Sequence, residues 1–216
     1  MRHLDRKVKT LLRKPYKGGG TMWPTAEIRW WWQADAMPAL RDWVLRGVSP
    51  IREFRTDLYL ADSQQTDIGI KRRAGGAVEV KMLSGLPDIS LPPAMSGQAE
   101  TWVKAESVAL PLNDENTIAV GKERLSRVLG FADGGWQEAG GQDEVEEGLA
   151  IEYTMVEAQG SKWTTIAFEA FGSDDPVRLL QAGITLFGAW PKEVAGPHLI
   201  GGYPLWLSEL ARGSRR

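Results

Sequence analysis

Cysteine is absent from this chain of 216 residues. Its absence excludes disulfides, a thiol nucleophile and zinc sites built on cysteine, and it fits a reducing cytoplasm. The two histidines, His3 and His198, stand in a basic tail and in a Pro/Gly-rich loop. Neither has the neighbours of a nucleophile or zinc site, so we expect both to be structural. The sequence also lacks a Walker A loop and a dinucleotide-binding glycine fingerprint.

Long apolar runs are missing as well. No run approaches the roughly 20 residues that span a bilayer, and the N-terminus lacks the apolar stretch of a signal peptide. The formal net charge is only -2, from 26 basic and 28 acidic residues. Nothing global therefore points to a membrane or to nucleic acid as the partner, and we expect a cytoplasmic protein.

The length of the chain fits one domain better than two. Basic residues are concentrated in residues 1–21, which end in Gly18-Gly19-Gly20. We interpret this segment as a flexible tail, with contact to nucleic acid or anionic lipid as the alternative. Residues 22–211 then form the domain, and residues 212–216 form a short C-terminal tail.

The most informative pattern is the alternation of charged with apolar residues. It recurs in six segments, which read Glu27-Ile28-Arg29, Arg55-Thr56-Asp57-Leu58-Tyr59, Lys71-Arg72-Arg73, Glu79-Val80-Lys81, Lys104-Ala105-Glu106 and Glu152-Tyr153-Thr154. Side chains two apart share one face of a strand, so each segment carries a charged stripe backed by an apolar one. The repetition predicts a closed or strongly curved sheet whose charged interior binds a highly charged partner.

The expected elements give an α+β fold with an antiparallel β-rich core. Strands are predicted over residues 26–33, 51–60, 67–73, 77–83, 98–110, 149–158 and 163–171. Helices are predicted over residues 38–45, 117–129 and 176–187, with a short terminal helix after Pro204. Two segments are predicted as loops: residues 86–97, which are rich in proline, and residues 131–148, which are rich in glycine and acidic residues.

The predicted interior holds two kinds of charge. Guanidinium and ammonium groups suit phosphate oxygens, and they are Arg29, Arg55, Lys71, Arg73, Lys81 and Lys104. Carboxylates are the hard oxygen ligands of Mg²⁺ and Mn²⁺, and they are Glu27, Asp57, Glu79, Glu106, Glu152 and Glu169. The combination is what metal-assisted phosphoryl chemistry requires. A structural network of ion pairs remains an alternative, because the two sets balance each other.

The order of these segments resembles the CYTH superfamily, the triphosphate tunnel metalloenzymes, from Thr25 to Leu210. The segments that carry the resemblance are Glu27-Ile28-Arg29, Arg55-Thr56-Asp57-Leu58-Tyr59-Leu60, Gly69-Ile70-Lys71-Arg72-Arg73, Glu79-Val80-Lys81, Ile166-Ala167-Phe168-Glu169 and Gly202-Tyr203-Pro204-Leu205-Trp206-Leu207. The resemblance implies an antiparallel β-tunnel of about eight strands with flanking helices. It also implies a triphosphate-bearing small molecule or inorganic polyphosphate as the ligand, and hydrolysis of the terminal phosphate with Mg²⁺ or Mn²⁺.

The resemblance further implies a role for each charged residue. Phosphate oxygens would be held by the basic set, Arg29, Arg55, Lys71, Arg73, Lys81 and Lys104. The metal would be held by Glu27, Glu106, Glu152 and Glu169. Glu27 and Lys81 would be the catalytic residues.

The first motif departs from the family pattern. The family opens with two glutamates and a lysine on alternate positions, where this chain has Glu27, Arg29 and Trp31. A fixed positive charge beside the glutamates weakens metal binding. The alternative function is therefore a non-catalytic phosphate- or nucleotide-binding module that has lost the metal centre. Trp31 either fills space or stacks on a base or ring of the ligand.

Overall fold

The computed structural model describes residues 23–60, 65–73, 76–93, 95–107, 112 and 117–213. The predicted basic tail of residues 1–21 lies outside this set. Of the predicted C-terminal tail, only Arg212 and Gly213 are described, and they form the end of the last helix.

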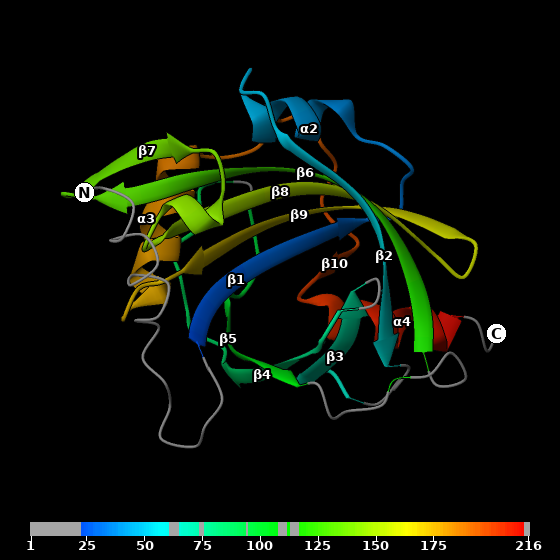
Figure 1. The fold of residues 1–216 in the computed structure, drawn as a ribbon. Helices are drawn as coiled ribbons and strands as arrows, with labels where there is room; N and C mark the ends of the chain where they lie inside the picture. Colours follow the sequence, from blue (N-terminus) through cyan, green and yellow to red (C-terminus); the bar gives the residue numbers. More distant parts are fainter. Residues whose placement is uncertain are drawn as a thin grey trace.

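Eight antiparallel strands form a closed barrel (Figure 1). They are β1 (Trp23–Trp32), β2 (Ile51–Leu60), β3 (Ile68–Arg73), β4 (Val78–Gly85), β5 (Glu100–Ser107), β6 (Thr117–Ala132), β8 (Gly148–Ala158) and β9 (Ser161–Phe171). Their order is β1-β5-β4-β3-β2-β6-β8-β9, and pairing of β9 with β1 closes the ring. Two short strands pair with barrel strands outside this ring: β7 (Gly135–Ala139) pairs with β6, and β10 (Leu199–Ile200) pairs with β1. The predicted α+β fold with an antiparallel barrel is confirmed.

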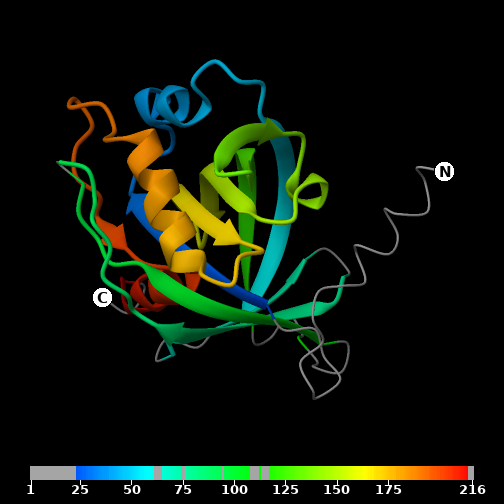
Figure 2. The same ribbon diagram turned by 90° about the vertical axis from the view of Figure 1, so that its left-hand side faces the viewer.

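Two helices cover the outside of the barrel. Helix α2 (Pro38–Leu45) has proline in its first turn and ends at Arg46, whose φ of 48° is left-handed. Helix α3 (Pro176–Phe187) is capped by Asp175, whose carboxylate accepts a hydrogen bond of 3.1 Å from the backbone N–H of Arg178. Figure 2 shows α3 lying along the outer face of the barrel, beside β9. Both helices have the predicted bounds.

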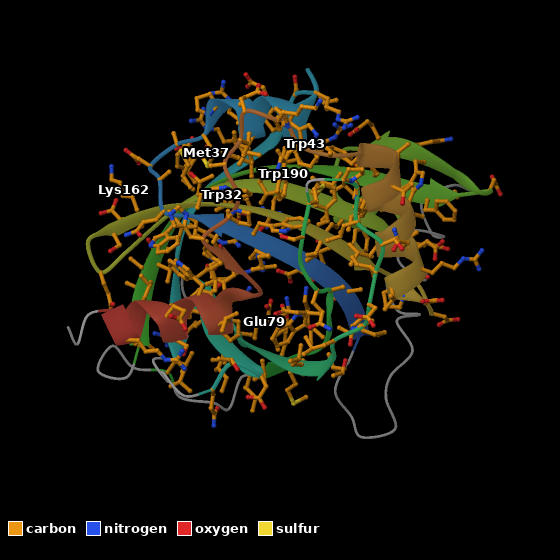
Figure 3. The ribbon with its side chains drawn as sticks, turned by 180° about the vertical axis from the view of Figure 1, so that it is seen from behind. Trp32, Met37, Trp43, Glu79, Lys162 and Trp190 are labelled. Carbon is orange, nitrogen blue, oxygen red and sulfur yellow. The ribbon has the colours of Figure 1, made fainter. Side chains whose placement is uncertain are left out.

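The largest apolar core lies between these helices and the outer face of the barrel. Strand β1 contributes Ile28, Trp30 and Trp32 to it, and α3 contributes Leu180 and Ile184. Figure 3 shows Trp32, Trp43 and Trp190 gathered on the α2 side of the sheet, whereas Glu79 points into the space that the strands enclose. Alternation along β1 therefore sends Trp30 and Trp32 outward, whereas the odd-numbered Glu27, Arg29 and Trp31 point inward.

A third helix, α4 (Tyr203–Gly213), crosses one end of the barrel. Trp206, Leu207 and Leu210 of α4 pack against inward-facing residues such as Trp31 and Val120. The space left between α4 and β3 is about 10 Å³, which is room for about one water molecule. We call this the α4 end of the barrel.

Two predictions along the chain are wrong. Residues 117–129, predicted as a helix, form most of β6. The glycine-rich segment 131–148, predicted as a loop, contains the end of β6, strand β7 and a short 3₁₀ helix over Gln142–Glu144. Strand β6 is buried on both faces along its second half, which produces the runs of apolar residues that resemble helical spacing. Among the described residues, no helix is long and apolar enough to cross a membrane.

Candidate functional site: the charged interior of the barrel

The inner face of the barrel carries a network of ion pairs. Its basic members number eight and are Arg29, Arg55, Lys71, Arg73, Lys81, Lys104, Lys122 and Arg124. Its acidic members number six and are Glu27, Glu53, Asp57, Glu79, Glu152 and Glu169. A seventh carboxyl group, Glu100, lies near the α4 end, where burial raises its pKa and thus favours its neutral form. Glu106 adds an eighth carboxyl group to the inner face, because it stands opposite Glu79 in the β4–β5 register. Among the described residues, the inner face therefore carries eight basic groups and eight carboxyl groups.

Glu27 is the one carboxylate of β1, and it is buried. Its Oε1 lies 2.8 Å from Nε of Arg29, and its Oε2 accepts a hydrogen bond from Nζ of Lys81. Burial alone would raise the pKa of Glu27, but the charges of Lys81 and Arg29 together lower it well below its usual range. Glu27 is therefore a carboxylate held between two cations.

Arg29 joins Glu27 to Glu152 on β8. Nη2 of Arg29 lies 2.5 Å from Oε1 of Glu152, and Nη1 donates to Oγ1 of Thr165 at 3.4 Å. Burial opposes ionisation of Glu152, but Arg29 and Arg124 lower its pKa to about 2. The guanidinium carbon of Arg29 also lies 4.8 Å from the centre of the Tyr203 ring, a cation–π distance.

A second buried group lies around Asp57 on β2. Nζ of Lys122 is 2.8 Å from Oδ2 of Asp57 and 2.7 Å from the Tyr59 hydroxyl, and it lies 3.8 Å from the centre of the Tyr203 ring. Only 2% of the Lys122 side chain is exposed. Burial lowers the pKa of Lys122 well below its ordinary value. This group is sealed against solvent by α4.

Exposure increases toward the opposite end of the interior. There Lys71 lies 2.8 Å from Glu79, and Arg73 lies 3.6 Å from the same carboxylate with half of its side chain exposed. Lys104 pairs with Glu169, and 15% of the Lys104 side chain reaches solvent. Burial would raise the pKa of Glu79, but Lys71 and the other nearby cations lower it to about 2. We call this region the exposed end.

The structure brings together nearly all the charged residues that the sequence predicts as a site. The predicted basic residues all belong to the network, as do Glu27, Glu152 and Glu169. Glu106 stands opposite Glu79 on the inner face, but its side chain is exposed near the end of β5 and takes part in none of these ion pairs. Lys122, Arg124, Glu53 and Tyr203 were not among the predicted site residues. Two signals could have revealed Lys122 and Arg124. Every second residue of this segment forms one face, made of Ile118, Val120, Lys122 and Arg124, as in a strand, and Gly121 is a poor helix former.

Of the two roles expected for Trp31, filling space and stacking on a ligand ring, the structure shows the first. Its ring is stacked on Trp206 of α4, with centroids 4.5 Å apart and planes at 3°. Its Nε1 donates a hydrogen bond of 2.7 Å to the carbonyl oxygen of Gly201. Trp31 therefore fills space at the α4 end and leaves no ring face open.

The predicted metal ligands do not assemble into a metal site. Within the described part of the chain, no group of three or more His, Cys, Asp or Glu residues is placed to hold a metal ion. Between Glu27 and Glu152 stands the guanidinium of Arg29, and Lys81 holds the other oxygen of Glu27. A divalent ion at this point would face two fixed positive charges, so the residues present do not fit Mg²⁺ or Mn²⁺ there.

A groove of about 320 Å³ lies on the outer face, between α2 and strands β2, β6 and β8. Arg52 and Glu123 border it, and they pair with each other at the surface. Tyr153 also borders it, but its hydroxyl is occupied by the backbone N–H of Met37. The groove thus offers no converging set of charges comparable to that of the interior.

No family model and no curated protein matches this chain. Among the solved structures that resemble this chain are two of the S. pombe Pct1 RNA triphosphatase. The first matches with 10% identity and a TM-score of 0.40 over 87% of this chain and 90% of that one. The second, in complex with the Spt5 CTD, matches with 8% identity and a TM-score of 0.39 over 86% and 90%. Matches this distant carry no argument about function.

Proposed function

We propose that the barrel interior binds the phosphate groups of a triphosphate-bearing small molecule or of inorganic polyphosphate. The observation that carries the proposal is a group of four partly exposed cations on the neighbouring strands β3, β4 and β5: Lys71, Arg73, Lys81 and Lys104. Each is paired with a carboxylate, but an ammonium or guanidinium group in one such pair keeps N–H donors for a second acceptor. The oxygens of a multivalent anion would therefore contact several of these cations at once.

These partly exposed cations of β3, β4 and β5 are the natural contacts for such an anion. Lys71, Lys81 and Lys104 each carry three N–H donors on the ammonium group, and one carboxylate uses only part of that capacity. Arg73 adds a planar fork suited to phosphate oxygens. Their spread over β3, β4 and β5 would let successive phosphates of one chain meet different cations.

Binding without hydrolysis is the form of the proposal that the contacts favour. Metal-dependent triphosphate hydrolysis requires carboxylates that are free to hold a cation. In this chain Glu27 and Glu152 are occupied by Arg29, and Glu169 is occupied by Lys104. We therefore propose the phosphate-binding module over the phosphohydrolase, with phosphate release as the measurement that separates them.

The experiment is a calorimetric titration with tripolyphosphate, ATP and thiamine triphosphate, followed by a phosphate-release assay with Mg²⁺ and with Mn²⁺. We expect binding that weakens as salt is added, and no release of phosphate. Lys71→Ala and Lys81→Ala should each weaken binding by about tenfold or more, which corresponds to about 1.4 kcal/mol.

The matched control is Lys162→Ala. Lys162 lies on the outer surface, pairs with Asp35 at 3.1 Å and is half exposed. Its removal changes the net charge equally but should leave the affinity unchanged. If none of the three compounds binds or raises the unfolding temperature, the proposal is wrong and the interior is a structural ion-pair network, because a ligand of the folded state must stabilise it.

A further inference from the structure

Two carboxylates in the barrel converge on one internal cation. Glu27 on β1 and Glu152 on β8 are separated by β9, yet both contact the guanidinium of Arg29. The register explains the reach: Arg29 and Glu152 are both direct neighbours of Ala167 on β9. A methyl group at position 167 is small enough for the arginine to pass over it.

The guanidinium is held firmly in this place. Only 6% of the Arg29 side chain is exposed, and its three nitrogens contact Glu27, Thr165 and Glu152. The ring of Tyr203 lies on it at 4.8 Å and that of Trp31 lies at 5.8 Å. Arginine stays charged at every accessible pH. The two carboxylates therefore always have a cation between them.

We propose that Arg29 is a built-in substitute for a divalent metal ion between Glu27 and Glu152. A metal ion at this point would compete with a fixed guanidinium and would be repelled by Lys81 and Arg124, which contact the same two carboxylates. In consequence, the barrel binds a polyphosphate group without a divalent cation, a statement that rests on the proposed function above. Arg29 is thus the residue that decides between a metal-free and a metal-loaded interior.

The first test is a calorimetric titration with Mn²⁺ alone, in the full chain. The wild type should show no site in the barrel, whereas Arg29→Glu places three carboxylates together and should gain a Mn²⁺ site. Arg124→Gln is the matched control, because it removes a positive charge from Glu152 at 3.5 Å and leaves Arg29 in place. It should not gain a Mn²⁺ site.

Arg29→Gln covers the case in which Arg29→Glu fails to fold. Glutamine removes the charge and keeps hydrogen-bond donors, so it should also bind Mn²⁺ more tightly than the wild type does. The inference is wrong if the wild type binds Mn²⁺ through Glu27 and Glu152 and neither Arg29 variant binds Mn²⁺ more tightly. Folding of each variant is checked by circular dichroism.

The second test compares tripolyphosphate binding to the wild type in EDTA and in Mn²⁺, with metal matched between cell and syringe. We expect equal affinity in the two buffers. A gain of about tenfold or more in Mn²⁺, equivalent to about 1.4 kcal/mol, would overturn the inference and leave the proposed function standing. Absence of binding in both buffers would overturn the proposed function, and the Mn²⁺ titration would still decide the role of Arg29.

Discussion

At the two ends of the barrel interior, the same residue types stand in different surroundings. Lys122, near α4, is 2% exposed and contacts Asp57, Tyr59 and the ring of Tyr203. Lys104, toward the other end, is 15% exposed and contacts Glu169. A buried pair with several contacts acts on stability, whereas a partly hydrated cation with spare donors can exchange water for a ligand. The comparison separates residues that hold the barrel together from residues that are available to bind.

The largest loss of stability is expected when Lys122 is replaced. Lys122→Ala leaves the carboxylate of Asp57 buried without its closest cation, which should lower the free energy of unfolding by about 3–5 kcal/mol. Urea denaturation followed by tryptophan fluorescence measures the loss. The double variant Asp57→Ala/Lys122→Ala should lose less than the sum of the two single variants, because the two residues are coupled. Strict additivity would show that the pair makes no such contribution.

A smaller loss of stability is expected when Glu152, which lies between the two ends, is replaced. The pKa of Glu152 is lowered from its ordinary 4.5 to about 2, so its charged form stabilises the fold above pH 4.5. This contribution is lost as the pH falls from about 4.5 toward 2. Glu152→Gln should therefore lower stability at pH 7 and flatten the acid limb of a stability–pH curve. An acid limb as steep as that of the wild type would contradict the assignment.

At the exposed end the expected change in stability is smaller still. Lys104→Ala should cost about 1 kcal/mol or less, because the Lys104–Glu169 pair is reached by water. The same substitution should weaken tripolyphosphate binding clearly in the calorimetric titration. If stability falls as far as in Lys122→Ala, then the two ends do not differ in the way described.

The smallest effect is expected outside the barrel. Lys162→Ala should change the free energy of unfolding by less than about 0.5 kcal/mol, as is usual for surface sites, because the Lys162–Asp35 pair is exposed. Tripolyphosphate affinity should also stay unchanged. A loss of affinity in this variant would mean that the ligand binds the outer face.

The sequence predicts the barrel wall well where one face is apolar and the other is charged. In β1 and β2 apolar and charged residues alternate, because one face of each strand lies against α2, α3 or solvent and the other face lines the charged interior. It fails in β6, where Ser126 and Arg127 are buried on opposite faces beside apolar neighbours, so that the period of two is lost. An alternation of apolar and polar residues does not indicate a strand that is buried on both faces.

The candidate site was predictable as a set of charges but not as a set of contacts. The parity of Glu27, Arg29, Lys71 and Lys81 along their strands already places them on one face. The position of Arg29 between Glu27 and Glu152 depends on the register of β1, β9 and β8 across the closed barrel. Registers between strands distant in sequence are set by the whole sheet, and no single segment encodes them.

Helix α4 closes one end of the barrel, where Trp206, Leu207 and Leu210 pack against Trp31 and Val120. Under the proposed function, a phosphate chain would therefore enter and leave by the other end and would not pass through the barrel. Only its terminal phosphates would contact the interior, so different molecules with the same phosphate end group would bind alike.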